Sequence, residues 1–216
     1  MTIEQARFNM IEQQIRPWDV LDAGVLALLG VVRREDFVPA AHRGLAFMDT
    51  EVPLPEGQQM LPPRVEARLL QELRVQRHER VLEVGTGSGF MAALLGHRAQ
   101  QVFTMEVRPA LAAQATDRLR RSGAANVTVL EADGSQGCPA EAPFDAILLS
   151  GSVAKVPEVL LDQLKPGGRL VAIEGDPPVM VAVRYTRGAD GFKREPLFDT
   201  IAPRLSGFAE TPRFHF

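Results

Sequence analysis

The fold of this chain is decided by Val81-Leu82-Glu83-Val84-Gly85-Thr86-Gly87-Ser88-Gly89-Phe90. A short apolar strand runs directly into three glycines at alternate positions, and an apolar helical pattern follows. Glycine allows positive φ angles in a tight turn and lets a ligand approach the backbone closely. The N-terminus of the helix presents free N–H groups. The stretch therefore predicts a strand, turn and helix that hold a nucleotide-like ligand.

The spacing of the glycines separates two classes of ligand. A dinucleotide-binding turn reads Gly-x-Gly-x-x-Gly, which would require glycine at position 90, where this chain has Phe90. The spacing present is Gly-x-Gly-x-Gly, with an acid two residues ahead of it. This variant suits a ligand without a pyrophosphate, whose amino-acid end and ribose lie over the turn. The cofactor-binding residues predicted here are Glu83, Gly85, Thr86, Gly87, Ser88 and Gly89.

Strands and helices alternate along the chain around this turn. Apolar patterns predict strands at 80–84, 101–105, 127–130, 144–149 and 169–174, and helices around 91–95, 111–119 and 156–164. We expect Lys165-Pro166-Gly167-Gly168 to end the last of these helices. Residues 179–186 and 192–200 flank a glycine-containing loop typical of a hairpin. The fold class predicted is α/β, a doubly wound and mainly parallel sheet with a C-terminal antiparallel hairpin.

An N-terminal helical extension precedes this pattern. Residues 3–15 show amphipathic spacing, and Asp22 is placed as the N-cap of a second helix over 23–32. Residues 33–62 are rich in proline and glycine and predict an irregular segment, which at this length is usually functional. We expect one compact unit, with the extension and an active-site loop over 1–62 and a cofactor-binding α/β domain over 63–216.

Two further acidic clusters follow the next two strands. Glu106 lies 21 residues after Gly85, near the offset of ~20 at which an acid binds ribose hydroxyls. Asp133 follows the third strand, where a carboxylate could accept from an adenine amine; alone, it could also be a turn former. Ligands bind at the carboxyl ends of strands in open α/β sheets. The nucleotide-type cofactor site therefore gains Glu106, Val107, Ala132, Asp133 and Gly134.

Composition and charge exclude several classes of protein. The 216 residues carry 24 Lys and Arg against 27 Asp and Glu, a net charge of -3, whereas nucleic-acid binders normally show a basic stripe. No apolar run reaches the ~20 residues of a membrane-spanning helix, and no secretory signal opens the chain. Cys138 is the single cysteine, which argues against disulfides and zinc clusters. We expect a cytoplasmic protein with no nucleic-acid or membrane partner and no metal, and the oligomeric state stays open.

The motifs resemble those of class I S-adenosylmethionine-dependent methyltransferases, and more narrowly the protein-L-isoaspartate O-methyltransferase family. The resemblance rests on Met10 to Ile15, Arg34 to Pro39, Gly57-Gln58, Glu83 to Gly89, Asp133-Gly134, Ala142 to Ile147 and Leu164 to Leu170. It implies a Rossmann-like enzyme with S-adenosyl-L-methionine as cofactor. It also implies, as a protein-repair reaction, methylation of the carboxylate of isoaspartyl residues in damaged proteins or peptides.

One loop departs from the pattern of that family. The family reads Gly-Gln-Thr-Ile-Ser-x-Pro, with the serine at the reacting centre, whereas this chain reads Gly57-Gln58-Gln59-Met60-Leu61-Pro62-Pro63. Leucine can neither donate nor accept a hydrogen bond. Three explanations stay open: Gln59 supplies replacement donors, the methyl acceptor is different, or the chain is a cofactor-binding module without catalysis.

The candidates for contact with the acceptor come from this loop and from the fourth strand. They are Gln58, Gln59, Met60, Leu61 and Ser150, and no residue is assigned as catalytic. Ser150 in Ser150-Gly151-Ser152 is expected just after the strand at 144–149, where it lines the acceptor pocket or caps a helix. Arg64 and Glu66 begin the helix after the loop, and we expect them on a solvated face.

Overall fold

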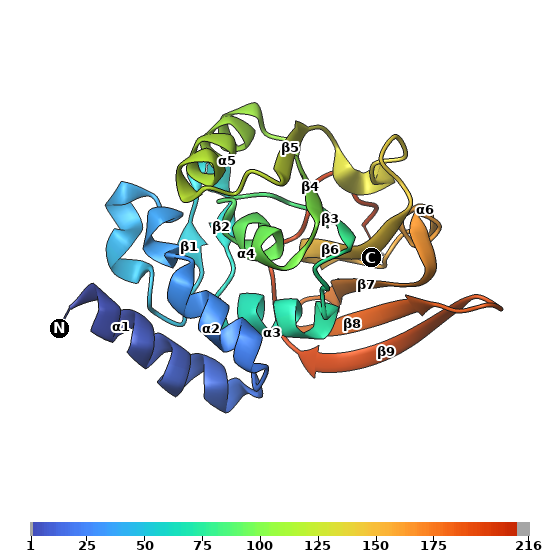
Figure 1. Ribbon diagram of the computed structural model, residues 1–216. Coiled ribbons are helices and arrows are strands. Elements are labelled where there is room, and N and C mark those ends of the chain that lie inside the picture. Colours follow the sequence, from blue (N-terminus) through green and yellow to red (C-terminus); the bar gives the residue numbers. More distant parts are fainter. Residues whose placement is uncertain (1, 211–216) are drawn as a thin grey trace, which may run out of the picture.

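The computed structural model describes residues 2–210 and builds them around one seven-stranded sheet (Figure 1). The strand order is β5-β4-β3-β6-β7-β8-β9, with parallel pairing from β5 to β7 and antiparallel pairing from β7 to β9. The strands are β3 (Arg80–Val84), β4 (Gln101–Glu106), β5 (Val127–Glu131), β6 (Phe144–Val153), β7 (Leu164–Asp176), β8 (Val179–Arg187) and β9 (Phe192–Asp199). This topology confirms the doubly wound, mainly parallel sheet and its C-terminal hairpin.

Successive side chains of the central strand enter two different cores. Val81 packs into the core under the larger group of helices, and Leu82 packs into the core on the opposite face. The helices are α1 (Ile3–Met10), α2 (Ala23–Val31), α3 (Pro63–Leu73), α4 (Phe90–Arg98), α5 (Pro109–Ser122) and α6 (Glu158–Leu161). Residues of α1 to α5 belong to the first core, and α6 supplies Leu160 and Leu161 to the second. Helices thus cover both faces of the sheet, with five of the described helices on one face and α6 on the other.

The connection between β6 and β7 differs from the prediction. The expected helix over 156–164 is a single turn, α6, and β7 already begins at Leu164. Leu164 pairs with Phe144 at the start of β6, so the segment Lys165-Pro166-Gly167-Gly168 lies inside a strand instead of ending a helix. A register shift after this pair absorbs the extra residues. The expected helix was wrong because this pairing with a distant strand leaves no length for it.

The first 62 residues contribute helices and a chain of short turns. Asp22 caps α2 as predicted, since its Oδ1 accepts from the backbone N–H of Val25 at 2.9 Å. After α1 the chain continues as a π turn (Ile11–Ile15), and 3-10 turns follow at Arg16–Trp18, Arg34–Asp36, Ala40–Leu45 and Pro55–Gly57. Two short antiparallel strands follow, β1 (Val52–Pro53) and β2 (Gln59–Met60). They pair two residues of the altered loop with the residues that precede the loop.

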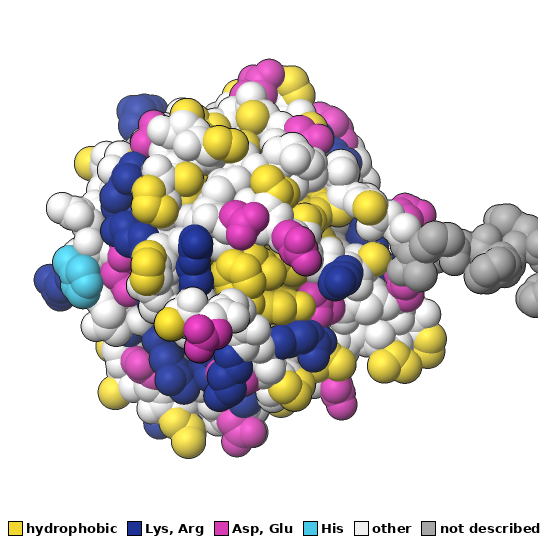
Figure 2. Space-filling view, turned by 90° about the vertical axis from the view of Figure 1, so that its right-hand side faces the viewer, with side chains coloured by type: hydrophobic (Ala, Val, Ile, Leu, Met, Phe, Trp, Pro, Cys, Tyr) yellow, Lys and Arg dark blue, Asp and Glu magenta, His cyan; other side chains and the backbone are white. Residues whose placement is uncertain are grey.

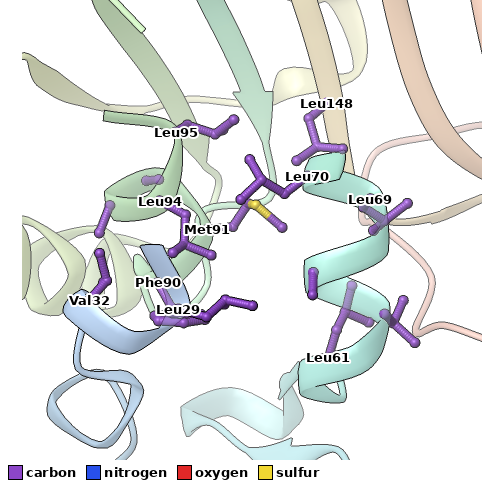
Figure 3. Packing of buried hydrophobic residues seen from close by; sticks show 14 of the residues in the cluster. Leu29, Val32, Leu61, Leu69, Leu70, Phe90, Met91, Leu94, Leu95 and Leu148 are labelled. Atoms are coloured by element: carbon purple, nitrogen blue, oxygen red, sulfur yellow. The ribbon is translucent and has the colours of Figure 1, made fainter. Parts of the chain in front are cut away.

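These N-terminal elements share the core beneath the sheet. Figure 3 shows Leu29 of α2 and Leu61, which precedes α3, in one cluster with Leu94 of α4 and Leu148 of β6. The boundary between 1–62 and 63–216 stays a prediction.

A buried ion pair anchors the irregular segment to α3. Arg34 is 1% exposed and pairs with the carboxylate of Glu66, which is 4% exposed. The remaining guanidinium groups donate to two carbonyls, from Nε to Ala46 at 3.0 Å and from Nη2 to Leu61 at 2.8 Å. Burial lowers the pKa of Arg34 to about 9. The expectation that Glu66 faces solvent is wrong, because among residues 2–210 this carboxylate is the counter-charge of the enclosed Arg34.

A second buried carboxyl lies inside the sheet. Glu83 of β3 is 0% exposed; Thr104 of β4 donates to its Oε2 at 2.7 Å, and Ser150 of β6 donates to its Oε1 at 2.6 Å. The hydroxyl of Thr86, in the glycine turn, lies 2.6 Å from that of Thr104. Burial raises the pKa of Glu83 to about 7, although the hydrogen bonds from the two hydroxyl groups lower this pKa in part. One side chain therefore ties three strands to the turn.

Replacing Glu66 by alanine should leave the Arg34 guanidinium buried without its counter-charge. We expect a loss of about 3–5 kcal/mol in the free energy of unfolding, measured by urea denaturation. Glu12→Ala is the control, because Glu12 forms a solvent-exposed pair with Arg16 and its loss should cost much less. Equal losses in the two variants would contradict an anchoring role for the buried pair.

The titration of Glu83 should appear in the pH dependence of stability. The folded chain keeps a proton on this carboxyl up to about pH 7, whereas the unfolded chain loses it near the ordinary value of 4.5. The free energy of unfolding should therefore contain a part that decreases as pH rises across this interval and is constant above it.

Glu83→Gln cannot titrate and should lose that part of the slope in urea denaturation between about pH 5 and pH 8. Glu158→Gln, at an exposed position in α6, should keep it. A slope unchanged by Glu83→Gln would show that this carboxyl is ionised in the folded protein throughout the interval.

Candidate functional site

A hollow of about 600 Å³, open solvent at its mouth included, lies at the carboxyl ends of β3, β4 and β5. We call it the outer hollow. It is lined by many of the residues predicted from sequence, namely Gln58, Gln59, Gly85, Gly87, Glu106, Val107, Ala132, Gly134 and Ser150. Three strand ends and the altered loop therefore meet at one place.

The glycine turn has the conformation that its sequence predicts. Gly85, Gly87 and Gly89 have φ angles of 96°, 51° and 86°, a region that residues with a Cβ rarely adopt. The backbone N–H groups of Gly85 and Thr86 donate to the carbonyl of Met105 at 2.9 and 3.2 Å, which holds the turn against β4. Gly89 does not line the hollow: a Cβ there would lie 3.4 Å from Ala115 of α5.

Glu106 ends β4 with its carboxylate at the wall of the outer hollow. Its side chain is 6% exposed; Oε2 accepts from the N–H of Gly87 at 2.9 Å and Oε1 from the N–H of Arg108 at 3.1 Å. A carboxylate offers about four lone-pair sites. One acceptor position on each oxygen is therefore left for a ligand with two neighbouring hydroxyls.

Asp133 lies near the outer hollow, and its side chain has a local partner. Its Oδ1 accepts from the N–H of Ser135 at 2.8 Å and caps the short turn Gly134–Gln136. Its neighbours Ala132 and Gly134 line the hollow, whereas Asp133 is itself exposed. The turn-forming role considered from the sequence is thus seen directly, and contact with a ligand stays a prediction.

A smaller inner hollow continues from the outer one between the glycine turn and the altered loop. Gln59, Gly85, Gly87 and Ser150 line both hollows. The inner hollow adds two of the predicted turn residues, Thr86 and Ser88, and two buried carboxyl groups, those of Glu66 and Glu83. Met60 and Leu61 contribute apolar surface. A group that enters from the outer hollow therefore meets one polar and one apolar wall.

Ser150 lies within β6, not after it as expected. The strand continues to Val153 because Ser152 and Val153 pair with Ile173 and Glu174 beyond a register shift. Ser150 and Gly151 fall in this irregularity. Such bulges re-aim side chains next to functional sites. Here the bulge directs the hydroxyl of Ser150 to Glu83 while the residue still lines both hollows.

The altered loop separates into a buried and an exposed part. Met60 and Leu61 are each 4% exposed and belong to the hydrophobic core. Gln59 is exposed, lines both hollows, and its side-chain amide has no hydrogen-bond partner among residues 2–210. The side chain of Gln58 donates to the carbonyl of Glu56 at 3.3 Å. Gln59 is therefore the loop residue with free donors at the site.

Residues near the C-terminal end complete the outer hollow and were missed from the sequence. Pro203, Arg204, Leu205 and Ser206 line it, together with Arg108. The first four follow the last strand and contain no motif that marks a ligand site. Their place depends on a parallel bridge between Arg204 and Ser152 in the extended part of β6, which no local pattern indicates.

Other kinds of site find no support in the described chain. Residues 2–210 contain no group of three or more His, Cys, Asp or Glu placed to hold a metal ion. None of the helices described is long and apolar enough to cross a membrane. Figure 2 shows one side of the molecule, where acidic and basic side chains are interspersed around small apolar patches.

Comparison with known proteins gives consistent results. Residues 5–201 match the family model for protein-L-isoaspartate(D-aspartate) O-methyltransferase. A protein-L-isoaspartate O-methyltransferase of Roseiflexus castenholzii is 40% identical over 212 residues, covering 98% of this chain and 97% of the relative. Protein-L-isoaspartate O-methyltransferase 1 of Syntrophobacter fumaroxidans is 40% identical over 193 residues, with 89% and 90% covered.

Solved structures show the same fold at lower identity. A Plasmodium falciparum protein, described as a protein-L-isoaspartate O-methyltransferase in complex with S-adenosyl-L-homocysteine, matches with a TM-score of 0.78 and 20% identity. The match covers 95% of this chain and 99% of that one. With a family model that spans most of the sequence and relatives that align over nearly their whole length, the chain belongs to the protein-L-isoaspartate(D-aspartate) O-methyltransferase family.

Proposed function

We propose that this chain transfers a methyl group from S-adenosyl-L-methionine to the free carboxylate of isoaspartyl residues in damaged proteins or peptides. The observation that carries the proposal is the outer hollow, where the glycine turn and Glu106 meet Gln59 of the altered loop. Family membership supports the same reaction and the same class of substrate. The free, buried thiol of Cys138 suits a cytoplasmic location, which we also propose.

The residues of the outer hollow suit this cofactor. Glu106 has an acceptor position free on each carboxylate oxygen, which matches the two hydroxyls of a ribose. The glycines let the amino-acid end of a ligand lie close to the backbone of the turn. Ala132 and Gly134 line the hollow, and we propose that they contact the adenine. We propose that Asp133, between them in the sequence, accepts from the exocyclic amine.

The reaction asks little of the protein beyond positioning. The cofactor, when bound, supplies a methyl group on a sulfonium; the C–S bond breaks as the O–CH₃ bond forms, and a neutral thioether leaves. An ionised carboxylate is already a nucleophile, so no residue has to remove a proton. The side chains around the hollows have to exclude water and hold the acceptor oxygen in line.

Gln59 is our candidate for holding the acceptor. The family's serine position is Leu61, which lies in the core and has no donor. The amide of Gln59 has two N–H donors, borders both hollows and is uncommitted within the described chain. We propose that it donates a hydrogen bond to the isoaspartyl carboxylate in place of the missing hydroxyl.

The cofactor proposal predicts a specific effect of Glu106. Glu106→Gln should raise the dissociation constant for S-adenosyl-L-homocysteine about tenfold to a hundredfold, since an amide cannot accept from both ribose hydroxyls. Isothermal titration calorimetry measures this constant. Glu131→Gln is the matched control, because Glu131 pairs with Glu106 across β4 and β5 but is exposed and outside the hollow. Tight binding of NAD, with no binding of the methyl donor or its product, would contradict the assignment.

The acceptor proposal predicts methyl transfer to an isoaspartyl peptide and none to the matching aspartyl peptide. Labelled S-adenosyl-L-methionine provides the readout. Gln59→Ala should lower kcat/KM about tenfold through loss of one hydrogen bond to a charged group, and Gln59→Glu should lower it further by repulsion of the carboxylate. Both variants should keep the cofactor affinity and melting temperature of the native chain.

Two outcomes would contradict the proposed function. If the native chain does not methylate the isoaspartyl peptide but Gln59→Thr combined with Leu61→Ser does, the acceptor has changed. If cofactor binds and no component of a cell extract is methylated, the chain is a binding module.

A further inference from the structure

We propose that Arg108 is a positioning residue that clamps together the two segments at the mouth of the outer hollow and so slows the release of the bound cofactor. The segments are the acceptor segment, residues 55–59, and the C-terminal strap, residues 203–207. The identity of the ligand rests on the proposed function, whereas the clamp itself is a property of the protein alone.

The C-terminal strap lies directly on the parts that hold the cofactor. Ser152 donates its N–H to the carbonyl of Pro203 at 2.8 Å, and Leu205 donates its own to the carbonyl of Ser152 at 2.9 Å. The side chain of Leu205 reaches over the glycine turn, where a Cβ on Gly85 would lie 2.7 Å from its Cδ2. Any ligand seated on the turn therefore has this strap as one wall.

The acceptor segment forms another wall and has a strained backbone. Glu56 is not a glycine and yet has a φ of 57°. A left-handed conformation is unfavourable for such a residue and persists only where other contacts support it. The residues that follow, Gln58 and Gln59, line the hollow. A contact that holds Glu56 in place also holds the candidate acceptor residue.

Arg108 reaches both walls from a fixed base. Its backbone N–H is bound to Glu106 Oε1 at 3.1 Å, just before α5 begins at Pro109. Its Nη2 donates to the hydroxyl of Ser206 at 3.0 Å, and its Nε lies 3.8 Å from the Glu56 carboxylate. The guanidinium side chain is 23% exposed and itself lines the hollow. One cation thus joins the strap, the acceptor segment and the ribose-site carboxylate.

The clamp should act on ligand exchange more than on folding. Partly exposed ion pairs contribute little to global stability. A ligand that leaves the hollow, however, has to part the walls that these contacts join, and contacts of this kind change dissociation rates by small factors. We therefore expect the loss of the clamp to change the dissociation rate of the ligand more than the stability of the fold.

The dissociation rate of S-adenosyl-L-homocysteine, measured by stopped-flow displacement, tests the proposal. Arg108→Gln should raise it about threefold to tenfold, and Ser206→Ala and Glu56→Gln should each raise it by a smaller factor. Arg120→Gln is the matched control, since Arg120 lies on α5 with a side chain 74% exposed. An unchanged rate in Arg108→Gln would overturn the clamp.

A double-mutant cycle separates a clamp from direct contact between Arg108 and the ligand. If Arg108 acts through Ser206, the variant that combines Arg108→Gln with Ser206→Ala should release the ligand no faster than Arg108→Gln alone. Factors that multiply independently would show that Arg108 does not hold the strap through Ser206, and would overturn the clamp.

A readout without ligand keeps the clamp independent of the proposed function. Hydrogen exchange of the Leu205 amide, which is bonded to Ser152, should be faster in Arg108→Gln and Ser206→Ala than in the native chain. Arg120→Gln should leave it unchanged. Failure of the native chain to bind the cofactor would refute the proposed function, whereas equal exchange in all variants would refute the clamp.

Discussion

The site depends on the hydrogen bonds that the buried carboxyl group of Glu83 accepts. It lies in the central strand β3 and accepts hydrogen bonds from Thr104 of β4 and Ser150 of β6, while Thr86 joins the same chain of hydroxyls from the glycine turn. A fully enclosed carboxyl is tolerated only where its oxygens are satisfied. Since each donor comes from a different element, satisfying this one group sets where the turn, β4 and the bulge of β6 lie relative to one another. The two hollows are the space left between them.

The position of the altered loop does not depend on a hydroxyl at residue 61. Leu61 contributes its side chain to the core and its carbonyl to Arg34, which is held in turn by Glu66. Both contacts fix the backbone that precedes α3, and neither needs a hydroxyl. The backbone of β2 also pairs with β1, so Gln59 stays at the border of the hollows. Leu61 has no donor of its own, and the proposed replacement is the amide of Gln59, two residues earlier.

The parts of the site that follow local rules could be predicted from the sequence. The glycine turn and Glu106 were found because their spacing is set within one strand–turn–helix unit and the next strand end. The bulge that places Ser150, the burial of Glu66 and the strap at 203–207 could not be found, because each depends on a partner far along the chain: Ile173 for β6, Arg34 for Glu66 and Ser152 for the strap. A charged residue at the start of a helix carries no signal that its counter-charge is enclosed 32 positions earlier.

Local and distant contacts hold different parts of the site. The residues proposed to bind the cofactor lie at the ends of central strands, which are held by ladder hydrogen bonds and by two cores. The acceptor segment and the strap are held by a few contacts from separate parts of the chain, such as those of Arg108. A difference at Gln59 and Leu61 is therefore compatible with an unchanged arrangement of the glycine turn and Glu106.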